Sequence, residues 1–411
     1  MSLLTDAQTI MQNALKAAQP DEAVRKALGD IDLSGKRRVL LAAVGKAAWQ
    51  MSKAALDLLG KRVDGGVVIT KHGHSMGPLS PLQVFEAGHP VPDEDTLIAT
   101  RAALHLVERI TKEDAVLLLV SGGGSALFED AKVPLDALQD ITRQMLAAGC
   151  DIVEINTVRK RLSNVKGGRF ALRCAPAHVY AIILSDIIGD PLDMIASGPA
   201  YPDSSTREDA LRIVERYHLQ LPQQALDALE EETPKELPNV TSMVTGSVTQ
   251  LCLSAAETAR QLGYTPHILT ASLRCQAKEA GSFLASMAEY HQDSSQSLAY
   301  ILGGETVVQL KGKGKGGRNQ EIALSAVPTL AACRDTCVFS LGSDGTDGPT
   351  DAAGGYADEH TLQKMKEAGV DPLAALENND AYPALRQVDG LIMTGPTGTN
   401  VNDLTVLLIK R

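Results

Sequence analysis

The chain is poor in aromatic residues and contains neither a Cys-x-x-Cys pair nor a long apolar run. Aromatic side chains make up 3% of its 411 residues, so its cores must be built from Ala, Leu, Val and Ile. Because the six cysteines show no metal-binding spacing and the first residues do not resemble a signal peptide, we expect reduced thiols and a cytoplasmic protein. The longest apolar runs, such as residues 115–120, are far shorter than the roughly 18 residues of a membrane-spanning helix.

An excess of positive charge is lacking too. The 39 Lys and Arg residues stand against 50 Asp and Glu residues, which gives a net charge of −11. Proteins that bind nucleic acids or anionic membranes over a broad surface are usually basic, so we expect neither partner. Small molecules remain as the expected partners, and the oligomeric state is left open, with a homodimer as one candidate.

Apolar strands alternate with helices through the first half of the chain. The strands show no polar alternation, which is typical of a parallel sheet covered by helices on both faces. The expected strands are residues 39–44, 67–70, 84–86, 115–120 and 179–185, and the clearest expected helices are residues 47–59, 96–110, 135–148 and 206–217. This pattern predicts a doubly wound α/β domain.

A second domain is expected because 411 residues exceed the usual size of one. Residues 232–239 combine prolines with charged residues, so we place the boundary near Pro238, with domains at residues 1–237 and 238–411. The second half again alternates strands and helices, which predicts a second α/β unit. Within it, strands at residues 299–302 and 306–310 are expected to pair as a hairpin.

Residues 311–320, which read Lys-Gly-Lys-Gly-Lys-Gly-Gly-Arg-Asn-Gln, form a strongly basic stretch. It lies between an apolar run and a helix expected at residues 321–327. Glycines let backbone N–H groups approach an anion, and the basic side chains supply the countercharge. The stretch therefore predicts a polyphosphate-binding loop.

Further candidates follow expected strands, because ligands bind at the carboxyl ends of parallel strands. Lys46 follows the strand at residues 39–44 and would lie beside a bound phosphate, although an exposed lysine at a helix start is an equally good interpretation. Ser121–Ser125 contains three successive glycines, which suit either a nest of N–H groups for an anion or a tight turn.

Carboxylates follow two further strands. Asp186 and Asp190 come after the strand at residues 179–185, where they could supply oxygen ligands to Mg²⁺ or accept a proton from a hydroxyl. Asp344 and Asp347 lie in a Gly-rich loop after a strand at residues 336–341. We favour a magnesium or substrate role for this loop over a plain turn.

Two patterns are interpreted as misleading. Residues 312–317 satisfy Gly-x-Gly-x-x-Gly, but their alternating lysines and their place in the second half of the chain do not favour a dinucleotide site. His72, His74 and His89 have no Cys or carboxylate partner at metal-binding spacing, so we interpret them as loop histidines. The sequence also lacks the P-loop and the protein-kinase motifs, so phosphoryl transfer would need another scaffold.

Motifs along almost the whole chain, in order, resemble those of the glycerate 2-kinase family. Members of this family carry a C-terminal MOFRL domain, and some are called hydroxypyruvate reductases. The motifs are residues 43–47, 121–127, 155–168, 184–190, 197–199, 303–305, 314–321, 342–351 and 395–400.

The resemblance implies ATP- and Mg²⁺-dependent phosphorylation of D-glycerate at its 2-hydroxyl. It implies an active site in a cleft between a Rossmann-like N-terminal domain and a smaller C-terminal domain. It also implies that Lys46, Arg318 and either Asp186 or Asp190 form the catalytic set.

On this basis we expect Lys46 and Arg318 to neutralise the transferred group and Asp190 to orient or deprotonate the hydroxyl. Arg159 or Lys160 is expected to bind the glycerate carboxylate. Asp186, with Asp344 or Asp347, is expected to hold Mg²⁺. The residues expected to contact ATP are Gly45, Ser121, Gly122, Gly123, Gly124, Ser125, Lys315, Gly316, Gly317 and Asn319.

The alternative is an NAD(P)H-dependent hydroxypyruvate reductase. Hydride transfer to a keto acid usually needs a histidine with a carboxylate partner, and none of the nine histidines has an obvious one in the sequence. A metabolite-binding module without catalytic activity is a second alternative, which ATP turnover would exclude.

Overall fold

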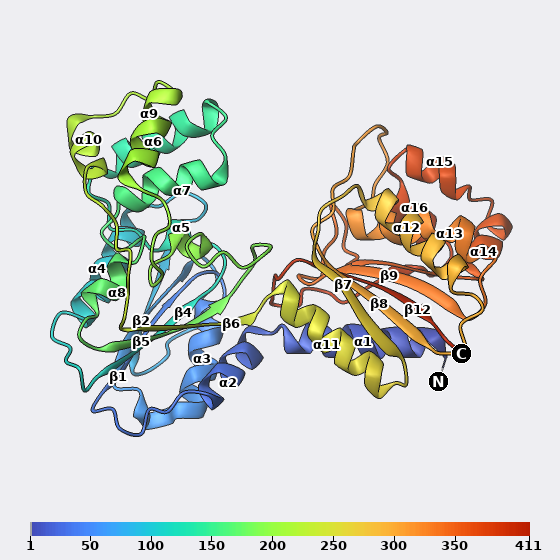
Figure 1. Ribbon diagram of the computed structural model, residues 1–411, viewed down its shortest axis with the longest axis horizontal. Helices are drawn as coiled ribbons and strands as arrows, with labels where there is room; N and C mark the ends of the chain where they lie inside the picture. Colours follow the sequence, from blue (N-terminus) through green and yellow to red (C-terminus); the bar gives the residue numbers. More distant parts are fainter. Residues whose placement is uncertain (1) are drawn as a thin grey trace. The chain divides into compact units, whose positions relative to one another are not determined.

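Two six-stranded sheets organise the computed structural model, which describes residues 2–411 (Figure 1). The N-terminal unit consists of residues 20–185 and 190–245. The C-terminal unit consists of residues 2–19, 186–189 and 246–411. Each unit is described by itself below.

The sheet of the N-terminal unit has the strand order β3-β2-β1-β4-β5-β6. The pairings from β3 through β5 are parallel, and β1 and β4 are buried along their whole length. This is the strand order of Rossmann folds, so the prediction of a doubly wound sheet is confirmed. The strands are β1 (Val39–Val44), β2 (Gly65–Lys71), β3 (Leu82–Ala87), β4 (Ala115–Val120), β5 (His178–Leu184) and β6 (Val240–Gly246).

Helices cover this sheet, with α2 and α3 on one side and α4 on the other (Figure 1). They are α2 (Pro20–Gly29), α3 (Ala48–Leu59), α4 (Glu94–Leu106), α5 (Gly124–Leu127), α6 (Leu135–Ala147), α7 (Ile152–Arg161), α8 (Arg169–Arg173), α9 (Arg207–Arg216) and α10 (Gln223–Leu229), with short 3₁₀ turns at Gly60–Arg62 and Ile195–Ser197. The expected helices at residues 135–148 and 206–217 are confirmed as α6 and α9. Helix α7 was not expected, although Asp151 and Glu154 form a capping box at its start.

The sheet of the C-terminal unit is mixed, in the order β11-β10-β9-β12-β8-β7. Only β7 and β8 pair in parallel, while the other four pairings are antiparallel. The strands are β7 (Thr265–Leu273), β8 (Leu298–Gly304), β9 (Thr336–Gly342), β10 (Gly354–Asp358), β11 (Leu391–Ile392) and β12 (Asp403–Ile409).

Figure 1 shows α12 to α16 on one side of this sheet and α1 with α11 on the other. The helices are α1 (Leu3–Ala17), α11 (Val248–Gln261), α12 (Ala277–Tyr290), α13 (Arg318–Leu330), α14 (Thr361–Glu367), α15 (Pro372–Glu377) and α16 (Ala381–Arg386). Helix α13 begins at Arg318, three positions before the expected helix. The last four residues of the basic stretch therefore lie at or inside a helix N-terminus.

The structure differs from the sequence interpretation in two places. The expected hairpin of residues 299–302 and 306–310 does not form, because β8 pairs with β7 and β12 while Val307 makes only an isolated bridge to Gln276. The unit division falls after Thr245 rather than near Pro238, because β6 lies in the N-terminal sheet beside β5. Residues 2–19 group with the C-terminal unit, so a division of the chain at one position does not describe the two units.

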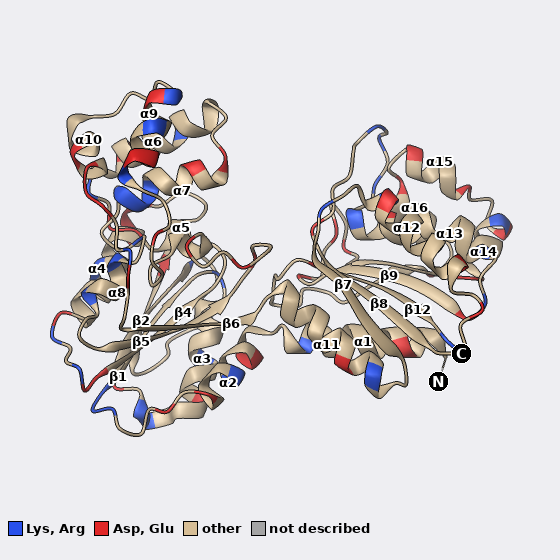
Figure 2. Cartoon of the chain, in the orientation of Figure 1, with Lys and Arg blue, Asp and Glu red and all other residues tan. Residues whose placement is uncertain are grey.

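Lys and Arg are interspersed with Asp and Glu over both units (Figure 2). No helix within residues 2–411 is both long and apolar enough to cross a membrane.

Candidate active site

The loops after β1 and β4 lie against each other in the N-terminal unit. The Lys46 N–H donates to the Gly122 carbonyl at 2.9 Å, and the Ala47 N–H donates to the Ser121 hydroxyl at 3.1 Å. Gly45 has a φ of +123°, and a Cβ at this position would lie 2.2 Å from the Ser121 hydroxyl oxygen. The structure therefore brings together Gly45, Lys46 and the Ser121–Ser125 loop, and it requires glycine at position 45.

Gly123 lies in the left-handed region with a φ of +89°, directly beneath two basic side chains. A Cβ at this position would lie 3.1 Å from His89 Nε2 and 3.3 Å from Lys46 Cε. Sequence reasoning set His89 aside, although it follows β3 at the same edge of the parallel sheet. Position after a parallel strand was the signal that could have identified it.

Ser125 belongs to a buried hydrogen-bond network with two residues that were not predicted. The Ser197 hydroxyl lies 2.9 Å from Ser125 Oγ and 2.9 Å from Asn156 Oδ1. Ala196 and Ser197 both have positive φ, at 51° and 59°, a strained conformation for residues other than glycine. Strain of this kind concentrates at functional sites, so the network marks the loop after β4 as a candidate site.

Arg159 reaches the same loop from α7. Its Nη2 donates to the Ser125 carbonyl at 3.0 Å, while its buried Nε has no hydrogen-bond partner in the described part of the chain. Burial lowers the pKa of Arg159, and the charge of Glu129 opposes that shift. A buried guanidinium with an unused N–H group is suited to an anionic ligand.

Lys160, the other residue predicted to bind the carboxylate, has a different environment. Its amine is fully buried and pairs with Asp203 at 3.0 Å and Asp193 at 3.2 Å. Arg161 joins the same buried network through Asp203 and Glu232. Lys160 neutralises these protein carboxylates, so of the two residues Arg159 is the one that we keep as the candidate.

Asp186 and Asp190 lie in the loop after β5. Asp190 adopts a φ of +50°, and its Oδ1 is buried without a hydrogen-bond partner within residues 2–411. A buried carboxylate oxygen is costly to leave unpaired. This oxygen is therefore a candidate acceptor for a substrate proton or a cation.

In the C-terminal unit, the backbone of the basic loop is already bound by the protein. Asn379 Oδ1 accepts from the Lys311 and Gly312 N–H groups at 2.7 and 3.0 Å. The Gly314 N–H donates to the Asn378 carbonyl, and the Lys315 N–H donates to Asp380. The protein itself therefore occupies these four N–H groups, while the roles expected for Gly316, Gly317 and the lysine side chains stay predictions.

The glycines of this loop serve close packing. A Cβ at Gly312 would lie 2.2 Å from the Asn378 carbonyl oxygen, and one at Gly314 would lie 2.5 Å from Asp380 Cβ. Gly316 likewise lies against Ala381. Lys315 extends over the ring of Tyr382, with its amine 4.7 Å from the ring centre.

Arg318 is the first residue of α13 and is held by two carboxylates. Its Nε and Nη2 bind the two carboxylate oxygens of Asp403, the latter at 3.0 Å, and its Nη1 lies 3.3 Å from Glu305. One third of the side chain stays exposed. Asp403, which begins β12, was not predicted because 85 positions separate it from Arg318.

Asp347 and Asn319 are engaged at the N-terminus of α13. The Asp347 carboxylate accepts from the Asn319 and Gln320 N–H groups at 3.1 and 2.9 Å and also from the Asn319 side chain. A Cβ at Gly317 would lie 2.2 Å from the Asp347 carboxyl carbon. The protein's own carboxylate therefore occupies the N–H groups of Asn319 and Gln320 at the start of this helix.

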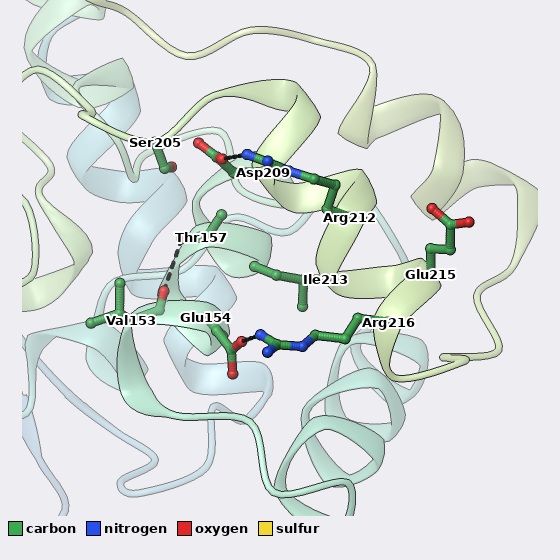
Figure 3. Close-up of a pocket in the computed structure, with 9 residues that line it drawn as sticks. All are labelled: Val153, Glu154, Thr157, Ser205, Asp209, Arg212, Ile213, Glu215 and Arg216. Carbon is green, nitrogen blue, oxygen red and sulfur yellow. Dashed lines mark hydrogen bonds and ion pairs between the residues drawn. The ribbon is translucent and has the colours of Figure 1, made fainter.

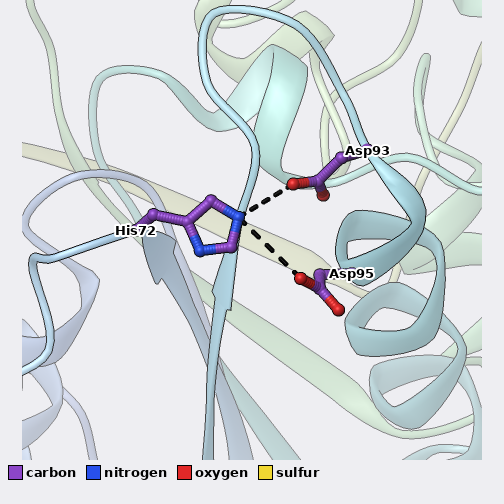
Figure 4. A group of neighbouring side chains, drawn as sticks. All are labelled: His72, Asp93 and Asp95. Atoms are coloured by element: carbon purple, nitrogen blue, oxygen red, sulfur yellow. Dashed lines mark hydrogen bonds and ion pairs between the residues drawn. The ribbon is translucent and has the colours of Figure 1, made fainter.

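Metal-binding geometry occurs at an unexpected place. Within residues 2–411, one group of His, Cys, Asp and Glu side chains gathers closely enough to hold an ion, namely His72, Asp93 and Asp95 (Figure 4). His72 Nε2 lies 2.8 Å from Asp93 and 3.9 Å from Asp95, so the view that His72 lacks carboxylate partners is wrong. Asp186, Asp344 and Asp347 form no such group in this part of the chain.

Of the two pockets described here, one is lined by predicted site residues. One, of about 650 Å³, lies beside the basic loop and is lined by Glu305, Lys313 and Arg318 among others. Another, of about 600 Å³, is formed by residues of α7 and α9 (Figure 3). In it Glu154 pairs with Arg216 at 3.0 Å and Asp209 pairs with Arg212. None of the predicted site residues lines this second pocket.

Comparison with known proteins gives consistent matches along the chain. Residues 6–230 match a family described as a domain of unknown function, DUF4147, and residues 298–403 match the MOFRL family. A protein named D-glycerate 2-kinase from Thermotoga maritima is 50% identical over 406 residues, which cover 97% of each chain. A protein from Agrobacterium vitis with a hydroxypyruvate reductase name is 36% identical, over 97% of this chain and 93% of its own.

The fold is matched as well. The crystal structure of a glycerate kinase from Thermotoga maritima superposes with a TM-score of 0.93 at 50% identity and covers 98% of this chain and 99% of its own. A crystal structure of a protein from Pyrococcus horikoshii gives a TM-score of 0.95 at 39% identity, with 100% and 99% coverage.

Proposed function

Because the chain belongs to the glycerate 2-kinase family, with a DUF4147 region followed by a MOFRL domain, we propose that it phosphorylates D-glycerate. The γ-phosphoryl group of ATP is transferred to the 2-hydroxyl, which gives 2-phosphoglycerate and ADP. The observation that carries this proposal is 50% identity to a D-glycerate 2-kinase over 97% of both chains.

In the proposed reaction, Asp190 accepts the proton of the 2-hydroxyl while that oxygen forms a bond to the γ-phosphorus. The bond from phosphorus to the bridging oxygen of ADP breaks in the same transfer. Lys46 and Arg318 neutralise the negative charge on the transferred group. Two features support these assignments, namely the buried, unpaired oxygen of Asp190 and the exposed amine of Lys46 over the Ser121–Ser125 loop.

Arg159 is proposed to bind the glycerate carboxylate. Its unused Nε and its contact with the Ser125 carbonyl support a fixed cation beside the Ser121–Ser125 loop, against which Lys46 lies. A small acid needs such a cation to fix its orientation. Lys311, Lys313 and Lys315 are proposed to attract the ATP phosphates through their side chains.

Mg²⁺ is proposed as the accompanying cation, and the chemistry of the available donors fits it. Asp344 uses one carboxylate oxygen for the Thr346 N–H at 2.9 Å and makes no hydrogen bond through the other within residues 2–411. Carboxylate oxygens are the ligands that Mg²⁺ prefers, so Asp344, together with Asp186, would hold it. When bound, Mg²⁺ would neutralise phosphate charge.

Asp344→Asn is expected to raise the Mg²⁺ concentration needed for half-maximal activity.

The deciding experiment incubates the protein with ATP and D-glycerate and identifies the product. Enolase dehydrates 2-phosphoglycerate but not 3-phosphoglycerate, so enolase coupling with and without phosphoglycerate mutase distinguishes the two. We expect product formation that enolase alone can follow. A product that requires the mutase would overturn the position of transfer, and the absence of ATP turnover would overturn the function.

Arg318→Ala tests the role proposed for Arg318. A transition-state arginine typically contributes about 10³-fold or more to turnover, so we expect a loss of that order. Exposed Arg334, on the same unit, provides the matched control as Arg334→Ala. Turnover close to that of the unmodified protein would remove Arg318 from the proposed mechanism.

The hydroxypyruvate reductase alternative is tested by mixing the protein with hydroxypyruvate and NADH or NADPH. We expect no oxidation of the nucleotide. Oxidation that depends on hydroxypyruvate, in a preparation without glycerate kinase activity, would replace the proposed function.

A further inference from the structure

His89 lies beside Lys46 above the loop that follows β4. Its Nε2 and Cδ2 come within 3.1 and 3.0 Å of the position that a Cβ on Gly123 would occupy, and Lys46 Cε comes within 3.3 Å of the same point. The ring and the lysine therefore share the space over Gly123. In the described part of the chain, no hydrogen bond or ion pair engages either ring nitrogen of His89.

The ionisable groups whose charges act on His89 are Lys46, Lys71 and His74. Lys46 follows β1, while Lys71 and His74 lie at and after the end of β2. Burial and then the charges of these three groups lower the pKa of His89. In its neutral form the ring has one N–H group to donate. Two lysines and an unused donor at one edge of the parallel sheet are arranged to receive an anion.

We propose that His89 is a further substrate-binding residue, which donates a hydrogen bond to an oxygen of the phosphoryl group that Lys46 neutralises. This inference rests on the proposed glycerate kinase function. It assigns the phosphoryl group rather than the glycerate carboxylate to this position, because Arg159 supplies a separate cation for the carboxylate.

The position of the ring suits this role. A donor fixed by the fold stabilises charge that develops during transfer without having to reorganise. Gly123 is essential to the arrangement, since a side chain there would fill the space between the ring, the amine and the loop. A neutral donor beside a lysine also holds the anion without adding repulsion between two fixed positive charges.

The first experiment compares His89→Ala and His89→Gln with the unmodified protein in steady-state kinetics. Loss of one fixed donor typically costs about 100-fold or more in kcat, so we expect that loss for His89→Ala. Glutamine keeps a neutral N–H donor. The kcat of His89→Gln is therefore expected to be at least about 10-fold higher than that of His89→Ala, which is roughly the effect of one hydrogen bond. The KM for D-glycerate is expected to change little in either variant.

His105→Ala is the matched control, because His105 is an exposed histidine of α4 that pairs with Glu108. Thermal unfolding of all variants identifies any loss caused by misfolding. Equal activity of His89→Ala and the control would overturn the proposal. A loss confined to the KM for D-glycerate would also overturn it, because it would place the carboxylate at His89.

A second experiment does not depend on turnover. NMR follows the ring ¹⁵N resonances of His89 while a non-hydrolysable ATP analogue or D-glycerate is added. These resonances are assigned because they are absent from the spectrum of His89→Gln. We expect them to move with the analogue and not with D-glycerate, and a missing response to the analogue contradicts the proposal. If the unmodified protein forms no 2-phosphoglycerate, the proposed function fails, while this spectrum still reports whether His89 binds phosphate.

Discussion

At the scale of single residues, the best-defined contact near the proposed chemistry is the pair of Arg318 and Asp403. Two guanidinium nitrogens bind the two oxygens of a carboxylate that is almost fully buried. Asp403 raises the pKa of Arg318, while burial raises the pKa of Asp403. This geometry fixes the plane of the guanidinium, which is what a transition-state contact requires.

Asp403→Asn is expected to lower kcat by about 10- to 100-fold, because Arg318 loses its two-point attachment while the volume of the site is retained. The KM for D-glycerate should change much less, since Asp403 orients another residue and does not itself contact substrate in our proposal. Glu305→Gln is the matched control, because Glu305 is half-exposed and such pairs contribute little. An unchanged kcat in Asp403→Asn would mean that Arg318 is positioned by other groups.

Asp347 gives the molecule a specific pH dependence. Burial raises the pKa of this carboxyl group from 3.8 to about 6, even though the backbone N–H groups of Gln320 and Asn319 oppose the shift. Its folded-state pKa lies above its unfolded value, so the folded protein binds the proton more tightly. Its contribution to stability is therefore fully present below pH 3.8 and is lost as the pH rises through about 6.

Asp347→Asn should remove this contribution from the pH dependence of the unfolding free energy between pH 3.8 and about 6. The measurement is urea unfolding at several pH values, with Asp351→Asn as control, because Asp351 is exposed and has a lowered pKa. Parallel pH curves for Asp347→Asn and the unmodified protein would contradict the assignment.

At the scale of elements, the basic loop is held in place by the segment between α15 and α16. Asn379 has a positive φ of 54°, accepts from two N–H groups of the loop and donates to the buried Glu321 at 2.9 Å. Sequence reasoning identified the charge and glycine content of the loop correctly. It assigned the N–H groups to a ligand, because the asparagine that binds them lies 68 positions away.

Asn379→Ala should destabilise the protein by about 2 kcal/mol, because four polar groups lose their partner. Hydrogen exchange at Lys311 and Gly312 should speed up, because their N–H groups lose their acceptor. Gln387→Ala, at an exposed position after α16, is the control. Unchanged exchange in Asn379→Ala would show that other contacts hold the loop.

Other elements were predictable for local reasons. Helices α6 and α9 carry an apolar stripe at helical spacing, and β1 and β4 are short apolar runs bounded by polar residues, so the sequence pattern was sufficient. The hairpin failed because residues 306–310 look like a strand but have no strand beside them to pair with. Strand pairing is decided by neighbours that are distant in the sequence, and local pattern does not contain them.

At the scale of the whole molecule, the first helix belongs to the C-terminal unit. Helix α1 packs on α11, and the buried Asp6 accepts hydrogen bonds from Tyr264 at 2.8 Å and Lys410 at 2.7 Å. The Thr399 hydroxyl also donates to the Ala18 carbonyl. The C-terminal unit is therefore completed by residues from the opposite end of the sequence.

Asp6→Ala should destabilise the C-terminal unit by about 2 kcal/mol, since the Tyr264 hydroxyl and the Lys410 amine lose their shared acceptor. Hydrogen exchange measured by mass spectrometry should increase in α1, α11 and β12. It should stay unchanged in β1 and β4. Lys16→Ala, at an exposed position of the same helix, is the control. An increase spread equally over both sheets would contradict this assignment.

The sequence by itself determined the buried parallel strands, the loops at their ends, the basic stretch and the family, because apolar periodicity, glycine content and ordered motifs are local properties of the chain. Only the tertiary structure decided how the charged residues are used. It paired Lys160 with Asp203, placed Asp347 at the start of α13, fixed Arg318 against Asp403 and set His89 beside Lys46. These contacts join residues that are up to 85 positions apart. The energy of a charge depends on its burial and partners, which only the folded chain supplies.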